Sequence, residues 1–182
     1  MKNVRSKLLF FVSFILLMSC NGQTTIDDAV KQLYGKKIKL DWNNLVVTGS
    51  ENADIEAIKQ SPFKIVTLFN EDSCTTCFMG HLEACITYYN TLPKDSVSYI
   101  CVVPIESQMI QLALQYFDTS GLTIISDTDN SYTRKNRIEK YNTFFCSYLL
   151  DSNDKIILVG DPIRNSNVQK LYNKTIRETA NK

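Results

Sequence analysis

The stretch from Lys64 to Cys77, KIVTLFNEDSCTTC, constrains the fold of this chain more than any other. It starts with a short apolar run rich in β-branched residues, which is typical of a buried strand. Four polar residues end that run before Cys74. After Cys77, apolar residues recur with the spacing of a helix that packs on a sheet, at Phe78, Leu82, Cys85, Ile86 and Tyr89. The sequence thus predicts a strand, a Cys-x-x-Cys pair and a helix, in that order.

This order predicts a reactive thiol. Unpaired backbone N–H groups and the helix dipole stabilise an anion at the first turn of a helix. Because the thiolate is the species that attacks disulfides, a cysteine in that position becomes a nucleophile. We therefore predict that Cys74 attacks and that Cys77, one turn further along, resolves a mixed disulfide on Cys74. The alternative for this pair is a static structural disulfide.

The N-terminus has the features of an export signal. Three basic residues precede an apolar run from Leu8 to Met18. That run is too short to cross a bilayer of about 30 Å as a helix, but it fits the core of a signal peptide. It ends in the letters LMSC at Cys20, which resemble a bacterial lipobox. We predict a lipoprotein signal peptide at 1–19 with lipid attachment at Cys20; the alternative is an ordinary secretory signal with a chance cysteine.

Charge and length restrict what the rest of the chain can be. The 20 Lys and Arg residues nearly balance the 19 Asp and Glu residues, so no basic face indicates nucleic-acid binding. The residues after the predicted signal suffice for one domain with its own core. We divide them into an N-terminal extension at 20–60 and an α/β domain at 61–182. The predicted location is the cell envelope, with the domain anchored to a membrane and facing the periplasm.

The extension contains no recognisable chemistry. Thr25 is predicted to cap a helix that has Ile26, Val30 and Leu33 on one face and ends at Gly35. Ile38, Leu40 and Trp42 alternate as in a half-buried strand. We expect this segment to cover an edge or a face of the sheet.

Strands and helices alternate through the rest of the chain. After the Cys-x-x-Cys helix, apolar patterns predict strands at 97–103, 122–127, 144–150 and 155–159, and helices at 105–117 and 168–179. Such alternation predicts an α/β sheet with helices on both faces.

With these elements in place, the chain resembles the thioredoxin-like superfamily. More narrowly, it is similar to membrane-tethered thiol–disulfide oxidoreductases of the TlpA/ResA type, including small lipoproteins of Bacteroidetes. Three segments support the resemblance: Cys74-Thr75-Thr76-Cys77 after its strand, Leu122 to Asp127, and the hairpin at 147–160. It implies a thioredoxin-like mixed sheet over 61–182 and a redox-active cysteine pair.

The chain departs from the family pattern beside the cysteine pair. Ser73 stands where the family usually has tryptophan, and Leu68 aligns near its buried acid. The family's cis-proline should fall at Phe145, where this chain has no proline. By that alignment Cys146 would lie close to the Cys74–Cys77 pair. Cys146 is thus a third redox thiol, a gate on the pair, or a small apolar residue on a strand. Phe145 and Cys146 are both accessory candidates.

His81 is the only histidine and a further accessory candidate. Cys77, His81 and Cys85 recur every four residues, so with Cys74 they could supply a Cys₃His metal site. A continuous helix, however, would separate Cys77 from Cys85 by about 12 Å along its axis. We therefore expect His81 to tune Cys77, and we predict no metal or other cofactor. Cys85 and Cys101 fit the apolar periodicity and are predicted to fill the core.

The predicted function is thiol–disulfide exchange by a lipid-anchored protein. Its expected partners are exported thiol or disulfide proteins and a membrane redox partner. The alternative is a thioredoxin-like binding module with reduced catalysis, which docks a protein or a metal. A peroxidase of the peroxiredoxin kind is a weaker alternative, because the pattern Pro-x-x-x-Thr-x-x-Cys is absent before Cys74.

Overall fold

The structure is a computed structural model that describes residues 25–40, 42, 46–48, 55–69, 75–104, 106, 110, 115, 121–138, 141 and 147–180. Four of the candidate site residues lie outside this part of the chain: Cys20, Cys74, Phe145 and Cys146. Most of the predicted helix at 105–117 also lies outside it. For Cys77, the structure describes the helical backbone alone.

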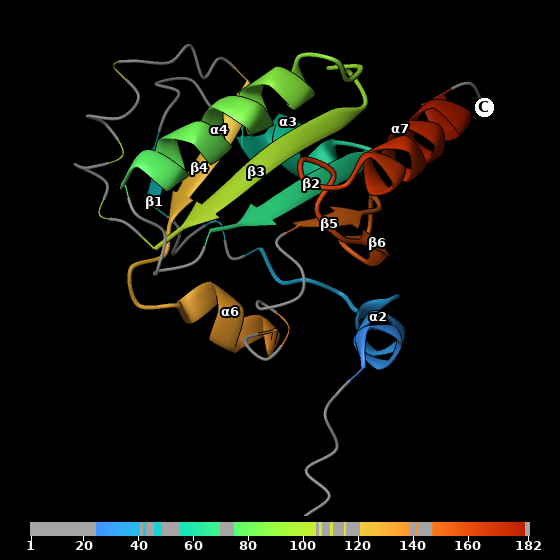
Figure 1. The fold of residues 1–182 in the computed structure, drawn as a ribbon, viewed down its shortest axis with the longest axis horizontal. Coiled ribbons are helices and arrows are strands. Elements are labelled where there is room, and N and C mark those ends of the chain that lie inside the picture. Colours follow the sequence, from blue (N-terminus) through green and yellow to red (C-terminus); the bar gives the residue numbers. More distant parts are fainter. Residues whose placement is uncertain are drawn as a thin grey trace, which may run out of the picture.

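Within the described residues, six strands form one mixed sheet in the order β1-β4-β3-β2-β5-β6 (Figure 1). The strands are β1 (Val46–Thr48), β2 (Phe63–Leu68), β3 (Val97–Val103), β4 (Leu122–Ser126), β5 (Ser147–Leu150) and β6 (Ile156–Val159). The central strands β2, β3 and β4 run parallel. The outer pairs β1–β4, β2–β5 and β5–β6 are antiparallel. The predicted α/β class is therefore confirmed.

Helices cover both faces of this sheet. They are α2 (Ile26–Leu33), α3 (Ile55–Gln60), α4 (Thr75–Tyr89), α6 (Ser131–Asn136) and α7 (Ser166–Ala180). Buried residues of α4 and α7 share one apolar cluster, and those of α2, α3 and α6 share another on the opposite face (Figure 1). Among the described helices, none has both the length and the apolar character needed to cross a membrane.

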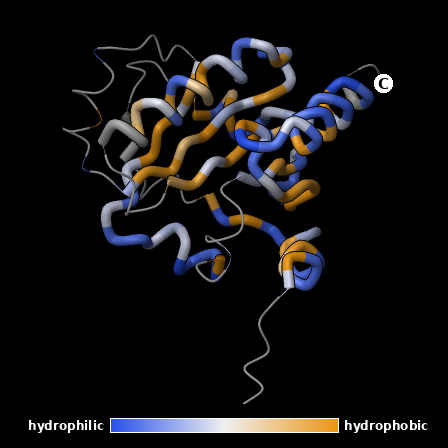
Figure 2. Tube along the Cα trace, viewed as in Figure 1, coloured by the Kyte–Doolittle hydropathy of each residue, from blue (hydrophilic) through white to orange (hydrophobic). Residues whose placement is uncertain are grey.

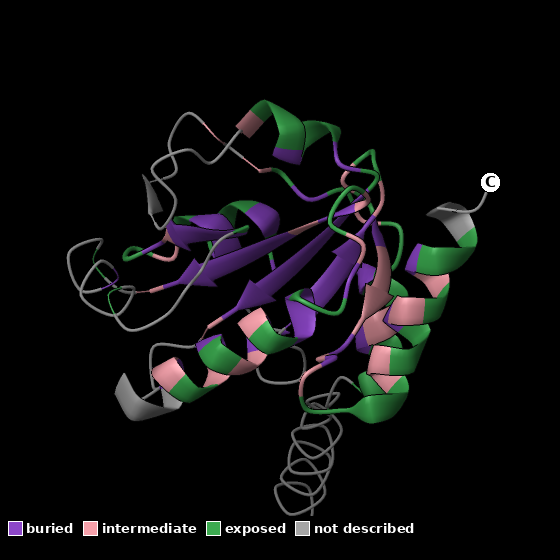
Figure 3. Cartoon of the chain, turned by 90° about the horizontal axis from the view of Figure 1, so that it is seen from above, coloured by how far each residue is buried: buried purple, intermediate pink, exposed green. Residues whose placement is uncertain are grey.

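The strand sequence assigns each side chain to one of these two clusters. Side chains alternate between the faces of a strand, so Ile65 faces α4 whereas Val66 and Leu68 face the other cluster. All six residues of β2 are buried, as expected for a central parallel strand covered twice. Figure 2 shows the apolar character of the central strands, and Figure 3 shows their burial between helices with exposed outer faces.

The helix predicted at the start of the extension is confirmed, but its buried face differs. Thr25 caps α2, accepting a hydrogen bond from the Asp28 N–H, while the buried residues are Ala29 and Leu33. Of the three residues expected on one face, Leu33 is fully buried whereas Ile26 is 58% exposed. The helix is held at its C-terminal end, where the Gly35 N–H donates to the Ile156 carbonyl, and Ile26 lies two turns away from this contact.

The strand predicted from Ile38 to Trp42 is wrong. Ile38, the first apolar residue of the alternating pattern, is buried. The backbone, however, forms only a single bridge here, between Lys37 and Lys155. The extension instead provides β1, which pairs antiparallel with β4. It thus contacts both outer sides of the sheet, at the β5–β6 hairpin and at β4, which confirms the expected covering role.

Candidate functional site

The helix α4 begins where the sequence predicts it. Its first residue is Thr75, so Cys74 directly precedes the helix in sequence and Cys77 belongs to its first turn. No acidic residue occupies that turn. The order of strand and helix around the cysteine pair is therefore confirmed. The reactivity and pairing of Cys74 and Cys77 stay predictions, as do the roles of Cys20, Phe145 and Cys146.

One turn beyond Cys77, His81 is held between an aromatic ring and a thiol. The Phe69 ring, directly after β2, meets the imidazole edge to face with a centroid distance of 5.0 Å. The imidazole also interacts electrostatically with the Cys85 thiol. The half-buried His81 thus lies between the end of β2 and the buried side chains of α4.

Beneath His81 lies a buried pair of free thiols. Cys85 of α4 and Cys101 of β3 are both fully buried and unoxidised. The Cys85 thiol interacts electrostatically with Cys101, and also with His81 and Tyr99. The predicted burial of the two cysteines is confirmed. Their mutual contact is a finding of the structure, since they are far apart in sequence.

Hydroxyl groups extend this cluster across the sheet. The Tyr99 hydroxyl and Thr67 Oγ1 share a hydrogen bond of 2.9 Å. Thr67 Oγ1 shares another, also of 2.9 Å, with Ser147 Oγ. These three residues are buried, and Ser147 is the residue after Cys146. The chain of polar contacts therefore runs from α4 through β3 and β2 to the start of β5.

Strand register explains why these polar side chains meet. Thr67 is paired with Cys101 on one side and with Ser147 on the other. Paired residues of neighbouring strands project from the same face of a sheet. The row Cys101–Thr67–Ser147 thus crosses three strands on the face that α4 covers. The sequence alone does not predict this row, because single polar residues within apolar runs give no strand register.

The contacts of the two thiols move their pKa values apart. The hydrogen bond with Cys101 is the largest cause that lowers the pKa of Cys85, to about 6, and His81 and Tyr99 act in the same direction against the effect of burial. The hydrogen bond with Cys85, followed by burial, raises the pKa of Cys101 well above its usual range. Cys85 is therefore the thiol of the pair that ionises first.

His81 responds in the opposite sense. Its hydrogen bond with Cys85 is the largest cause that raises the imidazole pKa above 6.5. Burial lowers this pKa, the Asp161 carboxylate raises it, and the Arg164 guanidinium lowers it. Imidazolium and thiolate thus stabilise each other.

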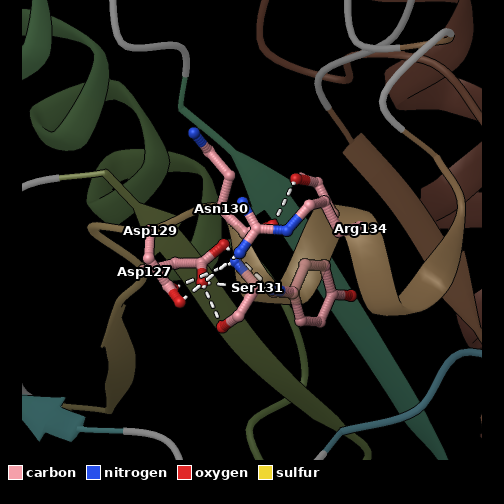
Figure 4. Close-up of polar contacts among 7 residues, drawn as sticks. Asp127, Asp129, Asn130, Ser131 and Arg134 are labelled. Carbon is pink, nitrogen blue, oxygen red and sulfur yellow. Dashed lines mark hydrogen bonds and ion pairs between the residues drawn. The ribbon is translucent and has the colours of Figure 1, made fainter.

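The aspartate that ends the second family-like segment has a structural role. Asp127 is 4% exposed and follows β4 directly. One of its carboxylate oxygens accepts hydrogen bonds from Ser131 Oγ at 2.9 Å and from the Tyr132 N–H at 3.1 Å (Figure 4). These contacts hold the first turn of α6 against the end of the strand.

The arrangement of the described residues does not provide a metal site. Among the residues that the structure describes, no three His, Cys, Asp or Glu side chains are placed to hold a metal ion together. An open cleft of about 580 Å³ lies at the other end of the sheet, where β3 and β4 begin, and its lining includes Ser61, Lys94 and Gly121. The thiol and histidine chemistry is thus buried under α4, away from this cleft.

Comparisons with known proteins establish the fold. No protein-family model matches the chain, and no curated protein matches it. A mutant of PrxQ from Xylella fastidiosa has a similar structure, with a TM-score of 0.53 and 11% identity, over 80% of this chain and 96% of that chain. Bacterioferritin comigratory protein from Xanthomonas campestris aligns with a TM-score of 0.51 and 13% identity, over 75% of this chain and 90% of that chain.

A mutant of peroxiredoxin Q from Xanthomonas campestris aligns similarly, with a TM-score of 0.53 and 11% identity, over 80% of this chain and 99% of that chain. At such low identity these similarities show the fold alone. The chain has an α/β fold of the thioredoxin-like kind, as the sequence predicts.

Proposed function

We propose that this chain is a lipid-anchored thiol–disulfide oxidoreductase of the TlpA/ResA type, which exchanges disulfides with an exported protein partner. The observation that supports it most is the thioredoxin-like fold in which a Cys-x-x-Cys sequence connects β2 to α4. A cysteine pair at the start of a helix that packs on a central strand suits thiolate chemistry.

The proposed cycle has two exchange steps. The Cys74 thiolate attacks a disulfide of the partner, forms a mixed disulfide and releases the first partner sulfur as a thiolate. The Cys77 thiolate then attacks the Cys74 sulfur and releases the second partner thiolate. The partner is thereby reduced by two electrons, and Cys74 and Cys77 become a disulfide. A membrane redox partner would restore the dithiol, and the reverse cycle would make disulfides.

Envelope anchoring is the second part of the proposal. It rests on the apolar run before Cys20 and on the lipobox-like letters LMSC. We expect the wild-type chain, expressed in bacteria, to incorporate a fatty-acid label and to fractionate with membranes. Cys20→Ser should lose both properties. A serine variant that retains label and membrane association would refute the lipid anchor while leaving the redox proposal intact.

Trapping tests the exchange chemistry directly. Cys77→Ser should accumulate mixed disulfides with exported proteins, because the resolving thiol is gone. Adding Cys74→Ser should abolish them, whereas adding Cys146→Ser should leave them in place if Cys146 is outside the chemistry. If Cys77→Ser accumulates no reducible adduct through Cys74, the proposal is wrong.

A binding module with reduced catalysis is the alternative. It is favoured by the departures from the family pattern at Ser73, Leu68 and Phe145. Reduction of insulin disulfides that depends on Cys74 would count against it. Partner or metal binding that survives Cys74→Ser and Cys77→Ser would support it.

Peroxide reduction is the third outcome to test. Bacterioferritin comigratory protein from Xanthomonas campestris, which shares the fold, has alkyl peroxide reduction activity. In this chain the Pro-x-x-x-Thr-x-x-Cys pattern is absent before Cys74, with Glu71 at the threonine position. We therefore expect negligible peroxide consumption. A rate that depends on Cys74 and exceeds disulfide exchange would replace the proposed function.

A further inference from the structure

The helix α2 has an exposed apolar stripe in addition to its buried face. Ala29 and Leu33 are buried against the sheet. Ile26, however, is 58% exposed, and Tyr34, which caps the C-terminal end of the helix, is 65% exposed. The half-buried Val30 lies between them in sequence, four residues from each, so the three side chains follow one side of the helix. The helix therefore presents apolar groups outward as well as to the core.

Basic side chains from two separate segments gather beside this stripe. One group follows α2, and the other belongs to the end of α6 and the residue after it. The Lys36 ammonium joins the two groups, because it donates a hydrogen bond of 3.1 Å to the Arg137 carbonyl. All of these side chains are exposed except Lys36, which is half-buried. We call this set the basic patch: Lys36, Lys37, Lys39, Arg134, Lys135 and Arg137.

The buried side chain of Asn136 fixes the two halves of the basic patch to each other. Its amide oxygen accepts a hydrogen bond of 2.7 Å from the Lys39 N–H. Its amide nitrogen donates to the carbonyls of Lys39, at 3.2 Å, and Tyr132, at 3.0 Å. The Tyr141 hydroxyl also donates a hydrogen bond to Gln32 of α2. The basic patch and the apolar stripe thus belong to one built surface.

Few acidic residues accompany this surface. Asp27 and Asp28 lie in the first turn of α2, where a carboxylate interacts favourably with the helix dipole. The Asp129 carboxylate is 3.5 Å from the Arg134 guanidinium. The whole chain, by contrast, has 20 basic and 19 acidic residues. Positive charge is therefore concentrated beside the exposed side of α2.

We propose that the apolar stripe of α2 and the basic patch dock onto an anionic lipid bilayer, so that this face of the domain lies on the membrane that holds the anchor. This inference rests on the lipid anchor of the proposed function and adds the orientation of the domain. Amphipathic helices with basic neighbours bind at the interface of anionic bilayers, with apolar side chains among the headgroups. Tyrosine is among the side chains that favour this interface.

The length of the chain before α2 suits this orientation. Thr25, which caps α2, is only five residues after Cys20. Five residues reach at most about 18 Å, so a lipid on Cys20 would keep the start of α2 close to the bilayer. Figure 1 shows α2 and α6 on the same side of the sheet and α4 on the other. The face nearest the anchor in sequence is thus the face with the basic patch.

Acylation of lysines in the anchored protein tests the proposal. The wild-type chain, purified from bacterial membranes, is reconstituted into phosphatidylglycerol vesicles and, in parallel, into phosphatidylcholine vesicles. A water-soluble reagent modifies the lysines, and mass spectrometry of peptides measures each rate. We expect Lys37 and Lys39 to react about threefold more slowly, or slower still, in the anionic vesicles. Lys170 and Lys174, exposed on α7, should react equally in both.

Salt and charge reversal test whether electrostatic attraction causes this protection. Protection should decrease in 1 M salt, where the screening length is about 3 Å. Arg134→Glu with Arg137→Glu should bring the rates of the two reporter lysines to those in neutral vesicles, because it reverses the charge beside them. The matched control is Lys170→Glu with Arg177→Glu, which makes the same change of charge at exposed positions of α7 and should leave the protection intact.

The apolar stripe is tested with a second matched pair of variants. Tyr34→Ser should weaken the protection of the reporter lysines, because it removes the most exposed apolar side chain of the stripe. Leu171→Ser removes an apolar side chain that is 53% exposed on α7, and it should have no effect. An equal loss of protection in both variants would overturn the role of the stripe.

The outcomes separate the docking surface from the anchor. Flotation with neutral vesicles tests the anchor alone. A chain that floats but shows equal lysine rates in the two kinds of vesicle keeps the anchor and overturns the docking surface. A chain that does not float with neutral vesicles, yet is protected by added phosphatidylglycerol vesicles, refutes the anchor and keeps the docking surface. Stronger protection by soluble polyglutamate than by anionic vesicles would assign the basic patch to an acidic protein and overturn the proposal.

Discussion

The two faces of the sheet bury polar groups in different ways. On the face covered by α2 and α6, the Lys64 side chain is 1% exposed and lies 3.0 Å from the Asp154 carboxylate. That carboxylate oxygen has no hydrogen-bond partner of good geometry, so the attraction is chiefly coulombic. On the face covered by α4, the buried polar groups are thiols that interact electrostatically and hydroxyls that are hydrogen-bonded to one another.

This difference gives the two faces of the sheet different chemical properties. The buried pair of Lys64 and Asp154 joins β2 to the β5–β6 turn through opposite charges. On the other face, the pKa of the Cys85 thiol is lowered to about 6 and that of the His81 imidazole is raised, so the protonation of this network depends on pH. The chain therefore places a fixed ion pair near the start of β2 and a pH-sensitive network near its end, on opposite faces.

The largest expected effect comes from breaking the fixed pair. Lys64→Met should lower the free energy of unfolding by about 3 kcal/mol, because it leaves the carboxylate of Asp154 without its buried partner. Urea unfolding followed by circular dichroism measures this change. The control is Lys59→Met, which removes the exposed pair with Glu56 and should cost less than about 0.5 kcal/mol. Equal losses of unfolding free energy in the two variants would show that burial of the Lys64–Asp154 pair does not increase its contribution to stability.

The two faces can be compared by swapping hydroxyl and methyl groups on adjacent residues of β2. Thr67→Val should destabilise the chain by about 2 kcal/mol, because the Tyr99 and Ser147 hydroxyls both lose a buried partner. Val66→Thr should cost a similar amount, because it puts a hydroxyl into an apolar cluster. Thermal unfolding of both variants measures these two losses of stability. A neutral Thr67→Val would contradict the polar path on the α4 face.

A smaller effect should come from the coupling of His81 with Cys85. A double-mutant cycle with His81→Gln and Cys85→Ser should give a coupling free energy of about 1 kcal/mol in favour of the native pair. The lowered pKa of Cys85 means that its contribution is lost as the pH falls through about 6. The raised pKa of His81 means that its contribution is lost as the pH rises through that raised value. Coupling should therefore peak between these limits, and a constant value from pH 5 to pH 9 would contradict the shifts.

The smallest effect concerns how α4 and α7 are held together. The Tyr88 hydroxyl donates a hydrogen bond of 3.0 Å to Asn173 Oδ1, outside the buried polar path. Tyr88→Phe should cost about 0.5–1 kcal/mol in urea unfolding. It should not alter the pKa of His81. A shift of that pKa in Tyr88→Phe would show that the network extends further toward α7 than its contacts indicate.

Much of the fold follows from the sequence, for physical reasons visible in particular elements. Continuous apolar runs predict β2 and β3 because strands buried on both faces tolerate few polar residues. The helix α4 follows from its apolar spacing and from the polar break before Cys74. The strand β1 was not predicted, since three residues at a sheet edge have no distinctive pattern. The alternation after Ile38 predicted a strand where the backbone makes a single bridge.

The candidate site was predictable only in part. The spacing of Cys77, His81 and Cys85 is visible in the sequence, so their common helix was expected. The contact between Cys85 and Cys101 depends on the packing of α4 against β3, and the contact of Thr67 with Ser147 depends on strand register. Neither can be derived from local pattern, because a shift of one residue turns every side chain to the other face.

The most direct test of the account is the pKa of His81 in the two redox states of the Cys74–Cys77 pair. An NMR titration of the imidazole carbon-bound protons, which reports on His81 alone because the chain has no other histidine, is done on the protein with the pair reduced and with the pair oxidised. The account predicts a higher pKa in the reduced form, because a thiolate on Cys77, one helical turn before His81, would stabilise the imidazolium and oxidation would remove that charge. Equal pKa values in the two states would show that the buried network and the candidate redox pair are independent of each other.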